Sequence, residues 1–106
     1  LGRRVRHVRG EDARVERAVA ALDAGVMASL GALLDASHAS LRDLYDASTP
    51  AVERTVAALR EAGATGARMV GGGFGGQVLA LLAPGVAVPA GALEVAPSAG
   101  ARLLRR

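Results

Sequence analysis

Residues 67–83 read Ala-Arg-Met-Val-Gly-Gly-Gly-Phe-Gly-Gly-Gln-Val-Leu-Ala-Leu-Leu-Ala, and this stretch decides the fold class of the 106-residue chain. Two short apolar runs, 67–70 and 77–83, lie on either side of a glycine-rich segment. Pro84-Gly85 follows directly, a turn pair that a helix interior does not tolerate. A continuous apolar run of this length between turn signals indicates a buried strand. The stretch therefore predicts two strands joined by a glycine-rich connection.

The sequence before these strands follows the helical period instead. Residues 11–24 open with two acids, which suit a helix N-terminus, and then repeat apolar side chains at helical spacing (Val15, Ala18, Val19, Leu22). A second helix is predicted from Val26 to Tyr45 or Asp46. Thr49 and Pro50 predict the cap and first residue of a third helix, which Gly63 ends in a left-handed conformation.

The region after the second strand carries weaker signals. Residues 86–106 contain Pro89, Pro97 and several glycines, and they offer one strand at 92–96 and room for another at 101–104. Three helices followed by strands is an α+β pattern, and the length allows one domain. We therefore expect a single domain over residues 1–106, with three helices packed on a small antiparallel sheet.

Composition and charge exclude several functional classes. The 13 basic residues are all arginine, and seven of them lie in residues 1–9 and 102–106, two ends that we expect to be frayed. Terminal arginines and 2% aromatic residues argue against a nucleic-acid interface, which clusters basic residues on one folded face. No apolar run approaches the ~20 residues that span a bilayer. Zero cysteines exclude a disulfide scaffold, and the composition predicts a cytoplasmic domain without a membrane partner.

The glycine-rich segment 71–76 contains the spacing G-x-G-x-x-G. A dinucleotide-binding reading fails, because that fingerprint requires a helix after the glycines and a strand is predicted here. A Walker loop fails as well, since the chain has no lysine. On spacing alone, the segment is a wide hairpin turn with Phe74 tucked into the core.

Other polar residues give weaker signals. His38 is predicted near the polar edge of the second helix, where a histidine is more often solvated or hydrogen-bonded than catalytic. His7, among the N-terminal arginines, is assigned no role. Asp35, Asp43 and Asp46 fall roughly along one helix face, and without a second cluster they predict a solvated face rather than a metal site.

Two stretches resemble the C-terminal half of the galactokinases, within the sugar- and metabolite-kinase superfamily called GHMP kinases. The first is similar to that family's S-H-x-S-L-R-D-x-Y segment and reads Ser37-His38-Ala39-Ser40-Leu41-Arg42-Asp43-Leu44-Tyr45. The second is similar to G-A-R-M-T-G-G-G-F-G-G, the third motif of the superfamily, and reads Gly66-Ala67-Arg68-Met69-Val70-Gly71-Gly72-Gly73-Phe74-Gly75-Gly76. With weaker matches before and between them, the resemblance covers about residues 5–83.

The chain also departs from the family pattern. Val70 stands where the family usually has Thr, and Gln77 where Cys is common. The family continues after Ala83 with a helix and a final strand, and residues 84–91 are too few for that helix. Residues 97–101 resemble the family's ending, so 84–106 is a shortened, divergent tail. The resemblance places the ATP-binding loop, the catalytic Asp and most galactose contacts in an N-terminal half that this chain lacks.

The resemblance implies the C-terminal lobe of a kinase that transfers a phosphoryl group from ATP to the anomeric hydroxyl of galactose, with Mg²⁺. No catalytic residue and no metal site are expected on this chain, which would be inactive without an N-terminal lobe as partner. The glycine segment would lie against the nucleotide loop of that lobe (Gly71, Gly72, Gly73, Phe74, Gly75, Gly76). A second set would line or support the cleft edge (Ser37, His38, Ser40, Arg42, Tyr45).

An alternative stays open. The chain would then be a stand-alone binding module, or a truncated relic that kept the fold without kinase activity. Loss of the helix after Ala83 favours it, because an uncovered apolar sheet is the kind of surface that binds a partner.

Overall fold

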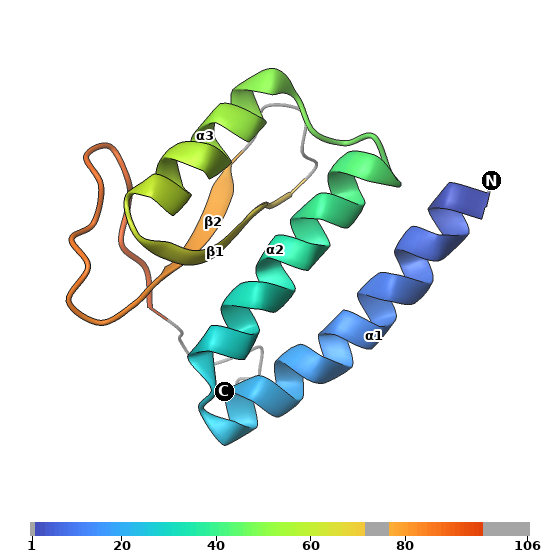
Figure 1. The fold of residues 1–106 in the computed structure, drawn as a ribbon, viewed down its shortest axis with the longest axis horizontal. Helices are drawn as coiled ribbons and strands as arrows, with labels where there is room; N and C mark the ends of the chain where they lie inside the picture. The colour runs from blue at the N-terminus through green and yellow to red at the C-terminus, as the bar shows by residue number, and fades with distance from the viewer. Residues whose placement is uncertain (1, 72–76, 97–106) are drawn as a thin grey trace, which may run out of the picture.

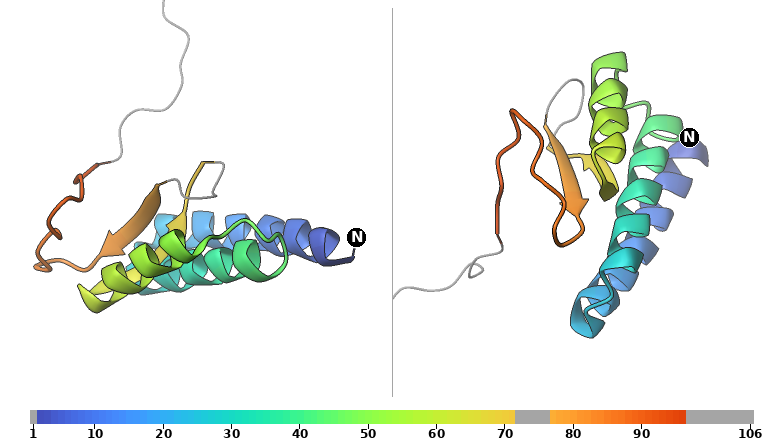
Figure 2. Two further views of the ribbon diagram at one scale, coloured as in Figure 1. Left: turned by 90° about the horizontal axis from the view of Figure 1, so that it is seen from above. Right: turned by 60° about the vertical axis from the view of Figure 1, so that its left-hand side comes forward.

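The computed structural model describes residues 2–71 and 77–96, in three helices and two strands. The elements follow the order α1 (Gly2–Ala24), α2 (Met27–Asp43), α3 (Pro50–Glu61), β1 (Ala64–Met69) and β2 (Val78–Leu82). The strands pair antiparallel, with Ala67 opposite Ala80 and Met69 opposite Val78. α2 and α3 both pack against β1, and α1 packs against α2 (Figure 1). The predicted α+β class is confirmed, with α1 in a second layer beyond α2 (Figure 2).

The N-terminal arginines are helical, so the expectation of a frayed end is wrong for residues 2–9. α1 begins at Gly2, and its first turns lie beside the end of α2 (Figure 1). Arg4 Nη1 donates to the Leu44 carbonyl oxygen at 2.9 Å, and Arg3 Nη2 donates to Asp46 Oδ1 at 2.8 Å. Cations stabilise a helix C-terminus, where the last carbonyls lack partners within the helix. These contacts extend α1 beyond the region that its apolar period predicts.

The apolar residues whose spacing predicts α1 lie mostly on its outer side. Val15, Val19 and Leu22 keep 62%, 54% and 57% of their surface exposed, whereas His7 and Ala21 are buried against α2. The period therefore identifies a helix correctly but not its packed face. The packed face is formed by small and polar residues that find partners on α2.

The residues predicted to begin and end α3 are confirmed. Thr49 has extended backbone, and its Oγ1 accepts a hydrogen bond from the Val52 N–H at 3.3 Å. Pro50 occupies the first turn, where a missing N–H costs nothing. Gly63 follows the helix with φ of 108°, in the left-handed region that glycine adopts without steric cost. The connection then enters β1 directly.

Thr49→Ala should lower the free energy of unfolding by about 1 kcal/mol, because the Val52 N–H loses its cap. Urea denaturation followed by circular dichroism measures this change. Thr55→Ala is the matched control, since the Thr55 hydroxyl donates only to a carbonyl of its own helix. Equal losses in the two variants would contradict a capping role for Thr49.

The core lies between α3, β1 and the end of α2. Its buried members are small or aliphatic, with Leu41, Val78 and Ala80 packed at the margin (Ala47, Val52, Val56, Ala67, Met69). α2 approaches β1 closely where Gly31 meets Gly66. A Cβ built on Gly66 would lie 2.0 Å from the Gly31 carbonyl oxygen, so this crossing requires glycine.

The tail differs from the prediction. Residues 92–96 form no strand, and the segment 83–96 is irregular. Pro89 has no N–H to donate, Gly91 turns the chain with φ of 84°, and Leu93 is 85% exposed. The predicted strand at 101–104, the family-like ending at 97–101 and the placement of Phe74 lie outside the described residues. Over the described ranges, none of the helices is both long and apolar enough to cross a bilayer.

Candidate functional site

The two motif stretches meet along the outer edge of β1. The Met69 N–H donates to His38 Nδ1 at 3.2 Å, and the Ala67 N–H donates to Asp35 Oδ1 at 3.0 Å. In an antiparallel pair, alternate residues turn their N–H groups away from the partner strand. Asp35 and His38, three residues apart on one face of α2, therefore accept bonds that a third strand would otherwise accept.

His38 links the end of β1 to α3. Its side chain is 1% exposed, and its Nε2 lies 2.6 Å from Glu53 Oε2. Because a backbone N–H can only donate, Nδ1 is the acceptor, and Nε2 carries the proton that it donates to Glu53. The prediction that His38 lies on the helix surface is wrong, since α3 and β1 cover it. Its hydrogen bonds hold three elements together.

Glu53 collects three donors. Besides His38, Ser48 Oγ donates to Oε2 at 2.5 Å and Arg42 Nη1 donates to Oε1 at 3.3 Å. Burial alone would raise the pKa of Glu53, but the hydrogen bonds from Ser48, His38 and Arg42 outweigh it and hold that pKa below 4.5. Glu53 is therefore an ionised carboxylate that holds the His38 ring in place. Its hydrogen bonds to Ser48, His38 and Arg42 indicate a structural role rather than a catalytic one.

A second chain of contacts, beginning on α1, reaches the same residue, Met69. Arg68 Nε donates to the Met69 carbonyl oxygen at 2.8 Å, and Arg68 Nη1 donates to Ser37 Oγ at 3.1 Å. Ser37 Oγ donates in turn to Glu11 Oε2 at 2.8 Å. Hydrogen bonds from Arg14 and Ser37 lower the pKa of Glu11 although burial opposes them. His38 of α2 thus accepts the hydrogen bond of the Met69 N–H. Its neighbour Ser37 holds Arg68, which donates to the Met69 C=O. We call this arrangement of Ser37, His38 and Arg68 around Met69 the Met69 clamp.

His7 has a structural role that the sequence did not reveal. It is buried, and its Nδ1 lies 2.7 Å from Ser40 Oγ across the α1–α2 contact. The ring also lies 5.0 Å from the ring of Tyr45, on which the Arg4 guanidinium stacks at 4.8 Å. Ser40 and Tyr45 of the first motif therefore fasten α1 to the end of α2.

The structure separates the predicted cleft residues into two groups. Ser37, His38 and Ser40 are buried within this domain, a position from which they support neighbouring elements. Arg42 and Tyr45 remain about half exposed. Gly71 is left-handed, with φ of 71°, and Gly72–Gly76 with Phe74 lie outside the described residues. The function of both predicted sets at a cleft stays a prediction.

The three aspartates that could suggest a metal site are held by arginines. Asp35 pairs with Arg60 at 2.8 Å, while Asp43 and Asp46 pair with arginines of α2 and α1. Across residues 2–71 and 77–96, no group of three or more His, Asp or Glu side chains is placed to hold a metal ion.

The domain should lose stability in acid through Glu53. Because its pKa is lower in the folded state, its ionised form stabilises the fold above pH 4.5, and that contribution disappears as the pH falls below this value. Glu53→Gln should flatten the acid limb of a plot of unfolding free energy against pH. Glu61→Gln, at the exposed end of the same helix, is the control and should follow the wild-type profile. An unchanged acid limb in Glu53→Gln would contradict this assignment.

Residues 18–100 match the protein-family model described as GHMP kinases C terminal. The chain belongs to this family. A galactokinase from Streptomyces coelicolor is 45% identical over 119 aligned positions, which cover 96% of this chain and 30% of the relative. Galactokinases from Thermotoga maritima and Homo sapiens are 50% and 49% identical over 76% of this chain. The chain spans less than a third of the length of these relatives.

Proposed function

We propose that this chain is the C-terminal lobe of a galactokinase, which phosphorylates the anomeric hydroxyl of galactose with ATP. The convergence of the two motif stretches on Met69 carries the proposal. Ser37 and His38 hold the last residue of β1, and the glycine segment begins two residues later. The relatives that are 45% and 50% identical to this chain bear the name galactokinase, and this supports the same reaction for the complete protein.

In this proposal the lobe contributes position rather than chemistry. Phosphoryl transfer depends on placing the phosphates and stabilising their charge, and a glycine backbone can approach a phosphate loop more closely than any other residue. Gly71–Gly76 would press on the nucleotide loop of an N-terminal lobe, with the Met69 clamp fixing where the segment starts. Arg42 and Tyr45 would lie at the rim of the cleft. ATP, galactose and the N-terminal lobe are the partners, and cytoplasmic location is part of the proposal.

Catalysis and Mg²⁺ binding belong to the other lobe in this scheme. Five acidic side chains are engaged by arginine, serine or histidine (Glu11, Asp35, Asp43, Asp46, Glu53), and no group of three or more possible metal ligands appears among the described residues. We therefore expect no sugar phosphate when this chain alone is incubated with ATP, Mg²⁺ and galactose.

A chimera tests the assignment. This chain replaces the matching C-terminal part of the Streptomyces coelicolor galactokinase, and galactose phosphate is measured with ATP and Mg²⁺. Activity in the chimera, with none in either part alone, supports the proposal. A folded, monomeric chimera that forms no galactose phosphate would overturn it, and activity of the lone chain would refute the division of labour between the lobes.

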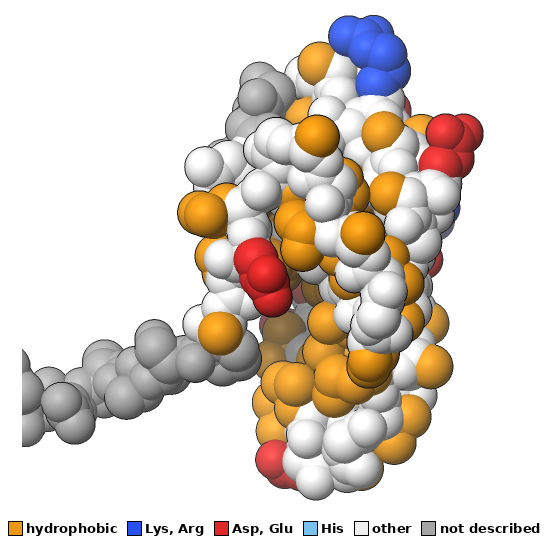
Figure 3. Space-filling view, turned by 90° about the vertical axis from the view of Figure 1, so that its left-hand side faces the viewer, with side chains coloured by type: hydrophobic (Ala, Val, Ile, Leu, Met, Phe, Trp, Pro, Cys, Tyr) orange, Lys and Arg blue, Asp and Glu red, His pale blue; other side chains and the backbone are white. Residues whose placement is uncertain are grey.

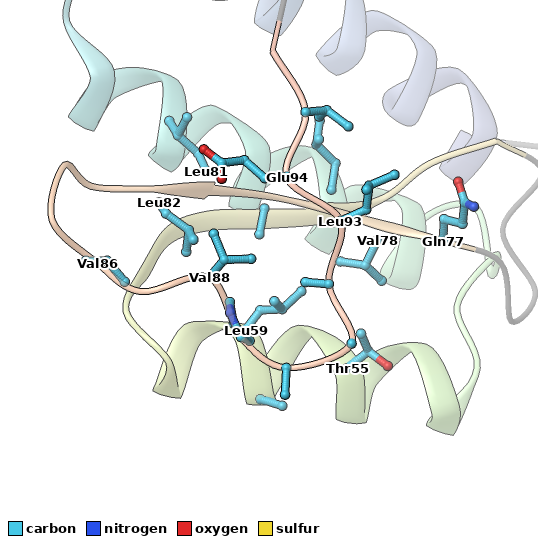
Figure 4. A pocket seen from close by; sticks show the side chains of 18 of the residues that line it. Thr55, Leu59, Gln77, Val78, Leu81, Leu82, Val86, Val88, Leu93 and Glu94 are labelled. Atoms are coloured by element: carbon cyan, nitrogen blue, oxygen red, sulfur yellow. The ribbon is translucent and has the colours of Figure 1, made fainter.

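A stand-alone binding module remains the second candidate. The apolar side chains that β2 and the tail leave exposed favour it (Figure 3), since Leu79 and Val88 keep 42% and 41% of their surface exposed. Val88 lines the same groove as Leu59 and Val78 (Figure 4).

A further inference from the structure

α1 carries an apolar stripe that α2 does not cover. Its residues follow one another at alternating intervals of three and four along the helix (Val5, Val8, Asp12, Val15, Val19, Leu22). The five apolar side chains keep 42% to 62% of their surface exposed, and Asp12 is exposed as well. α2 packs instead on the side of α1 that bears His7 (Figure 1). We call this exposed stripe the α1 seam.

The α1 seam has the spacing of a coiled-coil helix. An average interval of about 3.5 residues keeps one row of side chains against a partner helix along its whole length. In the seven-residue repeat lettered a to g, the seam residues occupy positions a and d, with Asp12 at an a position. Because α2 already holds α1 in place, the seam is formed before any partner arrives. The repeat therefore indicates a helix-binding surface rather than isolated exposed valines.

Charged residues beside the α1 seam select the orientation of a partner helix. Positions e and g flank the apolar row of a coiled coil, and their charges decide which helices pair and in which direction. On α1 the e positions include Arg9 and Glu16, and the g positions include Arg4 and Glu11. In a parallel pair of α1 helices, e faces g, so Arg9 would meet Arg4 and Glu16 would meet Glu11. Both contacts join like charges, which disfavours parallel self-pairing.

An antiparallel pair of α1 helices brings opposite charges together instead. Its e positions face each other, so Arg9 of each copy lies beside Glu16 of the other. In the same register Val8 of one copy packs on Val19 of the other. Sliding the helices by one heptad in either direction would bring together two Glu16 or two Arg9 side chains. The charges of α1 are therefore complementary to those of a second, reversed α1 in one register.

We propose that the α1 seam binds a second copy of this chain, with the two α1 helices antiparallel. The seam over residues 5–22 is about 26 Å long, which makes a small interface, so we expect a reversible dimer. Asp12 lies opposite Val15 of the other copy and weakens the pair, because its carboxylate loses water there. Dimerisation of this kind does not depend on kinase activity, so it can be tested separately from the proposed function.

Sedimentation equilibrium of the full chain measures the dissociation constant of the dimer, and circular dichroism checks that each variant keeps its helices. Arg9→Glu and Glu16→Arg should each weaken the dimer by about tenfold, because two attractive contacts become repulsive. The double variant carrying both changes should dimerise like the wild type, since the exchanged charges attract again. Arg17→Glu is the matched control. It changes the net charge as Arg9→Glu does, at an exposed position of α1 outside the seam, and should leave the dimer unchanged.

Asp12→Val completes the apolar row and should tighten the dimer by about tenfold or more. If the wild type and Asp12→Val were both monomeric at millimolar concentration, the proposal would be overturned, and the α1 seam would be left to a helix of another polypeptide segment. Tighter dimers in Arg9→Glu and Glu16→Arg would indicate parallel pairing and also overturn it. A dimer with the same dissociation constant in every variant would use a different surface, which is the third result that contradicts the proposal.

Discussion

Gly66→Ala should cost about 3 kcal/mol or more of the free energy of unfolding. The added methyl group would lie 2.0 Å from the Gly31 carbonyl oxygen and 2.6 Å from two further backbone atoms of Gly31. Overpacking usually costs about 1–3 kcal/mol when side chains can rotate away, but here only movement of α2 off β1 relieves the contact. Such a movement would also lengthen the Asp35 and His38 bonds to the strand. Urea unfolding followed by circular dichroism gives the loss.

Two helix glycines provide the control for this crossing. A Cβ on Gly31 would lie 2.6 Å from the Thr65 carbonyl oxygen, whereas a Cβ on Gly2 meets nothing within 4 Å. Gly2→Ala should therefore be neutral or stabilising, as helix propensity predicts. Gly31→Ala should destabilise despite the same gain in propensity. If Gly31→Ala and Gly66→Ala were both as stable as the wild type, the close crossing of α2 and β1 would be wrong.

Local chemistry made both ends of α3 and the presence of two strands predictable. Thr49, Pro50 and Gly63 act within a few residues of themselves, so their effect on the backbone can be read from neighbouring letters. The period change and the Pro84-Gly85 turn similarly indicated both strands, although β1 begins at Ala64, three residues before the predicted run 67–70. The predicted strand at 92–96 failed because a strand needs a neighbour, and residues 84–91 do not bring the tail into the sheet.

The packed face of α1 could not be predicted from its own residues. Periodicity assumes that valine and leucine face the core, yet α2 offers the hydroxyl groups of Ser37 and Ser40 to another side of α1. His7 is therefore buried and Glu11 partly buried, each with a partner on α2, while Val15 and Val19 stay exposed. Such pairs depend on contacts between residues 26 or more positions apart, which composition and spacing do not encode.

The candidate site was predictable from resemblance and not from chemistry. The motif with Ser37 and His38 is noticeable in the sequence only because it resembles a family. Its structural role follows from hydrogen bonds to Met69, Glu53 and Arg68, which lie far from it in the sequence. A lone histidine on a helix gives no sign that a strand amide and a glutamate from another helix will meet it. Glu53 in particular lies in the first turn of α3, where an acidic residue is common and does not by itself indicate a buried partner.

His38→Leu should cost about 3 kcal/mol, because it leaves the buried Met69 N–H without an acceptor and removes a donor from Glu53. Two conservative variants separate these losses. Asparagine can place an acceptor near the position of Nδ1, and glutamine can place a donor near that of Nε2. His38→Asn and His38→Gln should both be more stable than His38→Leu. Urea unfolding of the three variants measures this order.

Amide hydrogen exchange then decides what His38 does at the strand end. Met69 should exchange slowly in the wild type and in His38→Asn, which keep an acceptor, and faster in His38→Gln and His38→Leu, which lose it. The Val70 amide, which donates to the Gln77 carbonyl oxygen at 2.9 Å, reports whether the hairpin opens as a whole. Faster exchange at Met69 with unchanged exchange at Val70 would locate the effect at the clamp. Equal protection of the Met69 amide in all three variants would mean that His38 acts only through packing. The position at which the glycine segment leaves β1 would then be fixed by Arg68 and the strand pairing instead.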